Sequence, residues 1–310
     1  MRCVVVGAGV SGLSCAIRLL ESGHDVQVIS DKFSPETVSD VAAAIWYPFL
    51  TAPAHKADKW GIVTYDELER MSEEVPQAGV RMRDGREYLR EEVPLPTWKD
   101  DIAAFRVLEK AEIPEDYVFG WEFRAPVIEM PLYMPWLKRR VEELGGLFKQ
   151  RFIDSLSEID SEIVVNCVGL GARDLCDDEL VKPARGQIIF IDQDPGFGHF
   201  DQQPETLTYT IPRSDVTVLG GTAQVDDWDL NIRDEDNDLI LRKVEAIWPE
   251  LDRSKIIGGT VGLRPSRSEV RLEVESVDGT IVVHNYGHGG AGVTLSWGCA
   301  EDVVSIVEGC

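Results

Sequence analysis

The chain has 310 residues, of which 44% are hydrophobic and 28% charged, as is typical of a globular protein with one large domain or two ordinary ones. Its formal net charge of −24 argues against nucleic acid or an anionic membrane surface as a partner. The longest apolar runs are strand-sized and well short of the roughly 20 residues that a membrane helix needs.

The first thirty residues predict a strand, a glycine turn, a helix and a second strand. The apolar run at 2–6 is typical of a strand buried on both faces of a parallel sheet. A helix is predicted over 11–22 and the second strand over 25–29. Between the first strand and the helix lies GAGVSG (7–12), a GxGxxG motif.

The residues of this motif suit the binding of phosphate groups. Gly7 permits a tight turn, Gly9 lets backbone N–H groups reach a pyrophosphate, and Gly12 permits close packing of helix on strand. The helix N-terminus adds partial positive charge. Asp31 follows the second strand, where an acid accepts hydrogen bonds from a ribose. We therefore expect a bound dinucleotide; a simple glycine turn is the alternative.

Helices and strands continue to alternate along the rest of the chain. Residues 50–130 have a mixed pattern rich in proline, with a helix near 64–74. Later helices are predicted over 131–146 and 236–248 and from about 293, and strands over 162–166, 186–192, 207–211, 216–221, 256–264, 271–275 and 280–284. The strand–glycine–helix pattern at the end of the chain favours FAD over NAD, because flavoproteins often return to the cofactor there.

The predicted fold class is α/β, with two domains whose segments interleave. The first is a Rossmann-like FAD-binding domain built from 1–50, 132–185 and 259–310. The second is an α+β substrate domain, 51–131 and 186–258, built on a mostly antiparallel sheet.

The cysteine pattern predicts small core residues in a reducing compartment. Six cysteines show no CxxC pair and no regular spacing. The chain ends in EGC, which is not a peroxisomal targeting tripeptide. We expect a cytoplasmic protein of bacterial type.

The segment HNYGHGGAG (284–292) contains two histidines, four residues apart. Such a spacing joins two metal ligands on a helix, but here a strand is expected to end and a glycine loop to follow. With no third ligand evident, we expect no metal. The glycines instead predict a backbone surface that approaches a large flat ligand.

Five segments resemble the D-amino acid oxidase family, and they occur in the same order along the chain. They are DKF…DVAAAIWYPFL (31–50), RGQI (185–188), YTIP (209–212), GLRPSR (262–267) and HNYGHGGAGVTLSWG (284–298). The resemblance implies an FAD-binding domain interleaved with a substrate domain. It also implies oxidation of a D-amino acid to an imino acid, which hydrolyses to a 2-oxo acid and ammonia, while oxygen becomes hydrogen peroxide.

The resemblance assigns three residues to catalysis. Arg264 matches the arginine that binds the substrate carboxylate, where a guanidinium pairs bidentately and stays charged; a structural salt bridge is the alternative. Tyr209 matches a tyrosine that contacts the same carboxylate, and the carbonyl of Gly290 would accept the substrate amino group. Glu205 stands where relatives can carry a lid tyrosine, so the sequence does not decide whether a mobile lid exists. Arg267 has no assigned role.

The resemblance also assigns the cofactor contacts. Ile153 would lie near the adenine through its backbone, and Lys32 would flank the adenosine. Val38 stands where relatives usually carry a hydroxyl residue. The expected cofactor-binding residues are Gly7, Ala8, Gly9, Val10, Ser11, Gly12, Asp31, Lys32, Thr37, Ser39, Ala43, Ala44, Ile45, Ile153, Gly289, Gly292, Val293 and Thr294.

The expected reaction is hydride transfer from the substrate Cα to flavin N5, with an apolar pocket for the side chain. This pocket would comprise Ile45, Tyr47, Phe49 and Ile211. The helix from 293 to 308 could stabilise negative charge on the reduced flavin. The expected partners are a neutral D-amino acid and oxygen, and a homo-oligomer remains open.

Several alternatives stay open at this point. A glycine or sarcosine oxidase shares the fold and reaction type. A D-aspartate oxidase would need a second cation, for which Arg213 is the candidate; we expect Arg213 to be solvent-exposed, which ranks acidic substrates lower. A non-catalytic FAD-binding redox sensor and a nicotinamide dehydrogenase are further alternatives.

Overall fold

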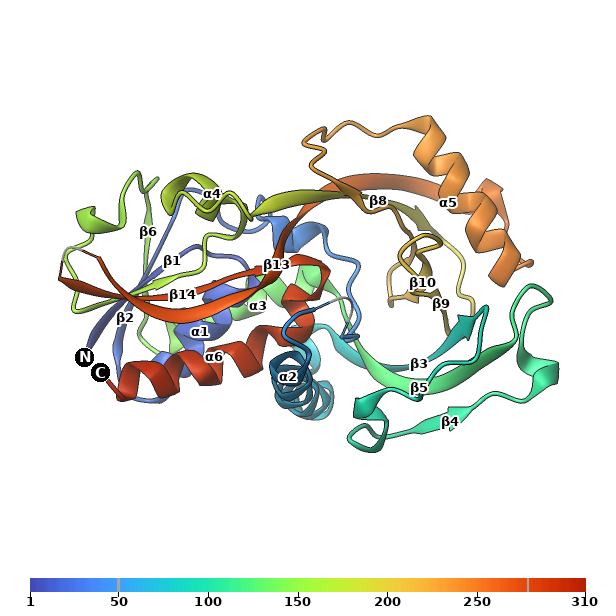
Figure 1. The fold of residues 1–310 in the computed structure, drawn as a ribbon, viewed down its shortest axis with the longest axis horizontal. Helices are drawn as coiled ribbons and strands as arrows, with labels where there is room; N and C mark the ends of the chain where they lie inside the picture. Colours follow the sequence, from blue (N-terminus) through green and yellow to red (C-terminus); the bar gives the residue numbers. More distant parts are fainter. Residues whose placement is uncertain (49–50, 278) are drawn as a thin grey trace.

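The computed structural model describes residues 1–48, 51–277 and 279–310. The strands in these ranges join into one continuous 14-stranded sheet that runs through the whole molecule (Figure 1). The strands are β1 Arg2–Val6, β2 Asp25–Ser30, β3 Val80–Leu89, β4 Phe105–Val107, β5 Phe119–Ile128, β6 Leu147–Gln150, β7 Ile163–Asn166, β8 Lys182–Ile191, β9 Gly198–Asp201, β10 Thr208–Pro212, β11 Thr217–Gly220, β12 Gln224–Val225, β13 Ile256–Val277 and β14 Thr280–His288. The helices are α1 Val10–Glu21, α2 Ala54–Glu74, α3 Met130–Glu143, α4 Ala172–Leu175, α5 Asp234–Ile247 and α6 Gly292–Glu308.

One end of the sheet is parallel. Its strands lie in the order β14–β7–β1–β2–β6, and every pairing between neighbours in this order is parallel. β1 lies near the middle, and its apolar residues 3–6 are buried, as expected for a strand covered on both faces. Helix α1 packs against α6 and α3 beside these strands (Figure 1). The N-terminal strand, turn and helix therefore form as predicted, with the helix starting one residue earlier.

The other part of the sheet is mostly antiparallel. Neighbouring strands pair antiparallel in the spatial order β9–β10–β11–β8 and in the order β3–β5–β4. In the described ranges, β3 and β9 form the one parallel pairing in this part. The mixed α/β class with a large, partly antiparallel sheet agrees with the prediction.

Strand β13 joins the two parts and differs from its prediction. The sequence predicts separate strands over 256–264 and 271–275, whereas β13 is continuous from Ile256 to Val277. Its first half pairs with β8 and its second half with β14, with an irregularity between Ser266 and Arg271. The polar residues at this irregularity look like a loop in sequence, but they mark the place where the strand exchanges partners (Figure 1).

Helix α2 is ten residues longer than the predicted helix over 64–74. Its first turns carry polar residues, which hide the apolar periodicity, but Trp60 is buried there against α6. A Cβ on Gly298 of α6 would lie 2.3 Å from the backbone oxygen of Trp60, so the two helices approach closely at that glycine.

Four of the six cysteines are buried, as expected of small core residues. Cys176 is half-buried, and Cys310 is exposed at the end of the chain. No disulfide forms among the described residues. Within the same ranges, no helix combines the length and apolar character that crossing a membrane requires.

Candidate functional site

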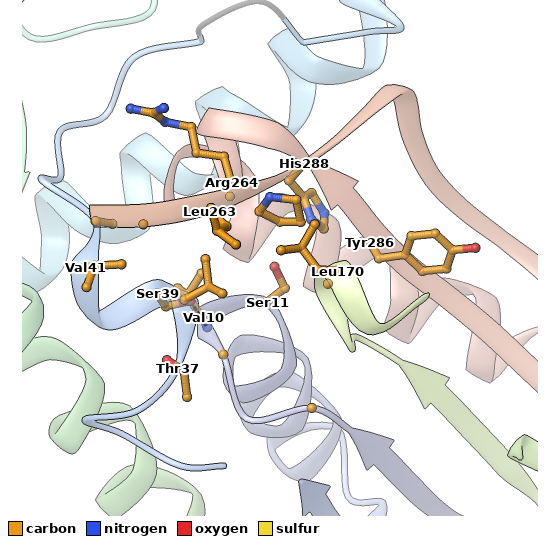
Figure 2. A pocket seen from close by; sticks show the side chains of 18 of the residues that line it. Val10, Ser11, Thr37, Ser39, Val41, Leu170, Leu263, Arg264, Tyr286 and His288 are labelled. Atoms are coloured by element: carbon orange, nitrogen blue, oxygen red, sulfur yellow. Dashed lines mark hydrogen bonds between the residues drawn. The ribbon is translucent and has the colours of Figure 1, made fainter. Parts of the chain in front are cut away.

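A cavity of about 590 Å³ lies along the junction between the parallel and antiparallel parts of the sheet. Its lining includes the glycine turn after β1, the segment after β2, the middle of β13 and the start of α6. Figure 2 shows Val10, Thr37 and Ser39 on one side of this cavity and Leu263 and His288 on the other. The site therefore combines segments that are distant in sequence.

The glycine turn forms a tightly packed part of the cavity wall. Gly7 has φ +105°, and a Cβ there would lie 2.4 Å from the carbonyl oxygen of Cys167. Gly12 does not line the cavity; a Cβ on it would lie 2.0 Å from the oxygen of Gly7. Gly12 therefore holds α1 against the turn, which is the packing role that the motif predicts. Residues 7–11 line the cavity.

The hydroxyl residues after β2 also border the cavity. The Oγ of Ser39 accepts a hydrogen bond from the backbone N–H of Val10, at 2.9 Å. Thr37 donates through its N–H and its hydroxyl to Asp40. These bonds attach the segment 37–41 to the N-terminus of α1. Val38 lines the cavity too, although it offers no hydroxyl.

A polar part of the cavity lies at the end of β2, next to the glycine turn, whose Gly7 N–H donates to the carbonyl of Ile29 at 2.8 Å. Asp31 and Lys32 line it together with residues 151–154, which follow the adjacent strand β6. The carboxylate of Asp31 is exposed and accepts no hydrogen bond from the residues that the structure describes. Ile153 is buried beside it.

Residues from two of the predicted segments also line the cavity. They are Ala43, Ala44, Ile45, Gly289, Gly290, Gly292 and Val293. Thr294 does not line it: its hydroxyl donates to the carbonyl of Tyr47 at 3.1 Å and accepts from the N–H of Tyr47 at 3.2 Å. The side chain of Thr294 thus positions Tyr47, and a cofactor contact of Thr294 stays a prediction.

Arg264 lies in the middle of β13, and its guanidinium points away from Val10 and Ser39 (Figure 2). Its Nη1 donates to the carbonyl of Thr222 at 2.8 Å. In contrast to Arg267, which pairs with Asp178 at 3.0 Å, Arg264 forms no salt bridge with any described residue. The alternative of a structural salt bridge is therefore not seen, and the charge at the cavity wall is left for a ligand.

The guanidinium of Arg264 packs against Gly186 of β8. A Cβ on Gly186 would lie 2.3–2.5 Å from the guanidinium atoms of Arg264, so the side chain rests directly on the glycine backbone. We expect Gly186→Ala to displace the guanidinium and to lower kcat/KM for the substrate by at least about tenfold, as an angstrom-scale misplacement of a binding group does. Steady-state kinetics at matched cofactor occupancy measures this. Unchanged kinetics would show that the position of Arg264 is unimportant.

Tyr209 lies on β10, and its ring packs on Gly220 and Gly221. It is buried and lines the same cavity as Arg264. Its hydroxyl makes no hydrogen bond within the described part of the chain.

Tyr47 lines the cavity as well, and burial, with the charge of Glu87, holds the pKa of its phenol well above the usual value. Tyr47 therefore stays protonated. Phe49, expected in the same pocket, lies outside the described residues.

Arg213 is placed differently from its prediction. Its side chain is only 6% exposed and binds Asp215 on the same turn, at 2.5 Å, because both follow β10 on its way to β11. It does not line the cavity. Glu205, at the position of the lid tyrosine, is exposed and does not line the cavity either, whereas Leu207 does. Neither residue therefore contributes a charge to this wall.

The two histidines of the C-terminal segment have separate partners. His288 lines the cavity and bonds through Nε2 to Oδ1 of Asn285 at 2.9 Å, and burial lowers its pKa to about 4. His284 bonds to Asn166 and Glu275. β14 continues to His288 and not only to 284, so both residues belong to a strand. In the described ranges no three side chains of the metal-binding types come together.

Sequence reasoning misses several residues that line the cavity. They include Val41, Val168, Gly169, Leu170, Gly171, Leu263, Asn285 and Tyr286. The small-residue turn after β7 provides a signal for the stretch at 168–171, since such turns allow close approach of backbone to a ligand. The others come from strand pairing over long distances, which no local pattern encodes.

A long cavity with a glycine turn at a helix N-terminus, an unpaired carboxylate and an unpaired guanidinium is typical of a protein that binds an extended anionic cofactor beside a small acid. Residues 2–306 match the family described as DAO, FAD dependent oxidoreductase. The chain belongs to this family of enzymes, and its cofactor is FAD.

Named relatives agree with this membership over nearly the whole chain. The chain is 42% identical to a D-amino-acid oxidase of Rubrobacter xylanophilus, over 98% of this chain and 95% of the relative. It is 39% identical to a D-amino-acid oxidase of Dictyostelium discoideum, over 98% and 91%. It is also 39% identical to a D-aspartate oxidase of Homo sapiens, over 100% and 95%.

Solved structures share the fold at lower sequence identity. Glycine oxidase from Geobacillus kaustophilus has a TM-score of 0.82 at 16% identity and covers 99% of this chain and 95% of its own. Glycine oxidase from Bacillus cereus has a TM-score of 0.80 at 16% identity, with the same coverage.

Proposed function

We propose that this protein is an FAD-dependent D-amino acid oxidase that acts on neutral D-amino acids. The observation that carries the proposal is the guanidinium of Arg264, which lines the cavity without a carboxylate partner in the described ranges, together with the free hydroxyl of Tyr209 on the same cavity. Two such groups suit a substrate carboxylate. The D-amino-acid oxidases among the relatives support the proposal.

The chain then divides into two interleaved domains. A Rossmann-like FAD-binding domain takes 1–50, 132–185 and 259–310, and the substrate domain takes 51–131 and 186–258. The parallel order of β14, β7, β1, β2 and β6 supports the first domain. The cavity is lined by residues of both proposed domains, as expected where a cofactor meets its substrate.

The residues present fit FAD. A helix N-terminus opens on the cavity behind a glycine turn in which a Cβ at Gly7 would overlap backbone. The carboxylate of Asp31 is free to accept from a ribose. The residues that would hold the phosphates, ribose and adenine are Gly7, Ala8, Gly9, Val10, Ser11, Asp31, Lys32, Thr37, Ser39 and Ile153, and those beside the flavin are Ala43, Ala44, Ile45, Gly289, Gly292 and Val293.

The protein's part in the reaction is to bind and orient the substrate. Arg264 and Tyr209 would hold the carboxylate, and the carbonyl of Gly290 would accept a hydrogen bond from the amino group. FAD, when bound, would supply the two-electron acceptor for the hydride of the substrate Cα, with oxygen as the final acceptor that yields hydrogen peroxide. With carboxylate, amine and side chain fixed, one enantiomer presents its Cα hydrogen correctly.

Neighbouring residues keep this end of the cavity dry and uncharged. Ile45, Phe200, Leu207 and Ile211 line it and contribute apolar surface. His288 stays neutral at physiological pH, since its pKa is lowered to about 4. The imino acid product would hydrolyse to a 2-oxo acid and ammonia after release.

D-aspartate oxidase is the second candidate, favoured by the 39% identity to the human enzyme of that name. It would need a cation for the second carboxylate. Arg213, the candidate from sequence, is bound to Asp215 and does not line the cavity. This placement favours neutral substrates.

A panel of D- and L-amino acids in a peroxide-coupled assay tests the proposal. We expect peroxide with neutral D-amino acids such as D-methionine or D-alanine, and at least about 100-fold lower kcat/KM for their L-enantiomers, because only one enantiomer presents its Cα hydrogen. Higher kcat/KM for glycine and N-methylglycine would indicate a glycine or sarcosine oxidase. Absence of peroxide from flavin-loaded protein with every substrate would indicate a non-catalytic flavoprotein.

A further inference from the structure

A row of side chains crosses the antiparallel part of the sheet and ends at Tyr209. Trp121 on β5 pairs with Glu87 on β3, Glu87 pairs with Phe200 on β9, and Phe200 pairs with Tyr209 on β10. Directly paired residues project to the same face of a sheet, so these four side chains share the face on which Phe200 and Tyr209 line the cavity. Neighbouring strands are about 4.8 Å apart, which places the backbone of Glu87 roughly 10 Å from that of Tyr209.

The carboxyl group of Glu87 is buried directly behind the cavity wall. The residue is 1% exposed, and its Oε1 accepts the N–H of Gln202, a lining residue, at 2.9 Å. Its Oε2 is buried with no hydrogen-bond partner in the described ranges, and the same holds for Nε1 of Trp121 next to it in the row. Folded proteins rarely leave buried polar atoms unsatisfied, so the surroundings of Glu87 compensate its carboxyl group only in part.

The charge of this carboxyl group reaches the cavity. No cation forms a salt bridge with Glu87 anywhere in the described part of the chain. Burial raises its pKa to about 8, the N–H of Gln202 opposes the rise, and Asp201 adds to it. The negative charge of Glu87 in turn contributes to the raised pKa of Tyr47, which lines the cavity.

We propose that Glu87, from behind the cavity wall, determines which charge the side chain of a substrate can carry: neutral side chains, such as the amide of D-glutamine, are accepted, and the isosteric carboxylate of D-glutamate is disfavoured when Glu87 is ionised. The inference rests on the proposed oxidase function. Arg264 and Tyr209 would fix the α-carboxylate at one end of the row, and the side chain would extend along Phe200 toward Glu87.

Above about pH 8, where Glu87 is ionised, a second carboxylate placed there would face a like charge in a poorly hydrated region, which disfavours its binding. An amide in the same place carries no charge and meets no such repulsion. The other titratable groups on the elements packed around Glu87 include Asp201 at the end of β9, Tyr47 and Tyr209. Arg86 and Glu122 are bonded to each other, at 2.8 Å, and alternate to the opposite face of β3 and β5.

The isosteric variant Glu87→Gln tests the inference. Its side-chain oxygen can still accept the N–H of Gln202, so the cavity wall is kept while the charge is removed. We expect the ratio of kcat/KM for D-glutamine over D-glutamate, measured at pH 9, to fall by about tenfold relative to the wild type, as expected for two charges roughly 10 Å apart at an effective dielectric constant of about 20. A structural disturbance would change both substrates alike and leave the ratio unchanged.

Glu129→Gln is the matched control, because Glu129 is equally buried but its carboxylate pairs with Arg81 and accepts the N–H of Ser214, whereas Glu87 accepts only the N–H of the lining residue Gln202. Its ratio should equal that of the wild type. A second measurement needs no variant. The wild-type ratio should rise between pH 6.5 and 9, because Glu87 ionises in this range. Both substrates share the same α-amino and α-carboxyl groups, so the titration of these groups cancels in the ratio.

An unchanged ratio in Glu87→Gln, or a wild-type ratio independent of pH, would overturn the role of Glu87. Turnover of D-methionine with peroxide release in the same preparations tests the proposed function separately. If no D-amino acid is turned over, the proposed function fails; if D-methionine is oxidised but the ratio does not move, only the inference about Glu87 fails.

Discussion

Replacing Arg264 with alanine is expected to raise KM for neutral D-amino acids by roughly 30- to 5,000-fold while FAD stays bound, since removing one partner of a desolvated charge pair costs about 2–5 kcal/mol and 1.36 kcal/mol is tenfold. The large effect follows from the surroundings. Among the described residues no acid pairs with this guanidinium, so its removal leaves no buried carboxylate behind and the fold should persist. The loss therefore falls on the substrate alone.

The measurement is steady-state peroxide release together with the flavin absorbance of the purified variant. Arg264→Lys, which keeps the charge but loses the fork, should lie between the alanine variant and the wild type. Arg213→Ala is the matched control, because Arg213 binds Asp215 outside the cavity; KM for D-alanine and for D-aspartate should both stay at their wild-type values. An unchanged KM in Arg264→Ala would remove the assignment of Arg264.

The contiguous parts of the site could be predicted from sequence. The turn at Gly7 and Gly9 and the helix after it depend on local chemistry: a left-handed φ at Gly7 and the close approach of Gly12 to backbone both require glycine. The same applies to the strand that precedes the turn, whose apolar run is buried on both faces. Such features lie within a dozen residues, and no long-range pairing is needed to recognise them.

The parts that depend on pairing could not be predicted in this way. Arg264 and Gly186 are 78 residues apart, and their contact exists because β13 lies beside β8 in a particular register. Thr294 has a plausible position at the start of α6, but its hydroxyl is used by Tyr47. Arg213 has a neighbour two residues away that binds it, and sequence alone could not say whether that pairing or solvent would prevail.

Glu87 shows the same limit most clearly. In sequence, a lone glutamate within REYL, next to an arginine, is typical of a surface residue. In β3, the side chains alternate, so the neighbouring Arg86 projects to the opposite face of the sheet. Only the pairing with β9 and β5 places it between Trp121 and Phe200. Its burial then has a consequence for stability that is independent of any role in substrate choice.

The free energy of unfolding is expected to fall by up to about 5 kcal/mol between pH 4.5 and 8 because of Glu87 alone, at about 1.4 kcal/mol per pH unit. The sign follows from proton binding: burial raises the folded-state pKa from 4.5 to about 8, so in this window the folded protein keeps a proton that the unfolded chain has lost. Stability from this group is complete below pH 4.5 and is lost as the pH rises through 8.

Glu87→Gln removes this titration and keeps the shape. Near pH 5 the protonated carboxyl and the amide are close equivalents, so the variant and the wild type should unfold at similar urea concentrations. Near pH 9 the variant should be the more stable by several kcal/mol, up to the limit of about 5 kcal/mol set by the shift. Urea unfolding of both holoproteins at saturating FAD and at each pH measures the difference. The pKa values of His199 and His288 are lowered to about 4 in both proteins, so the titration of these histidines cancels in the difference. A difference in stability that does not change between pH 5 and 9 would mean that Glu87 ionises freely in the folded protein, through water or a cation that reaches it.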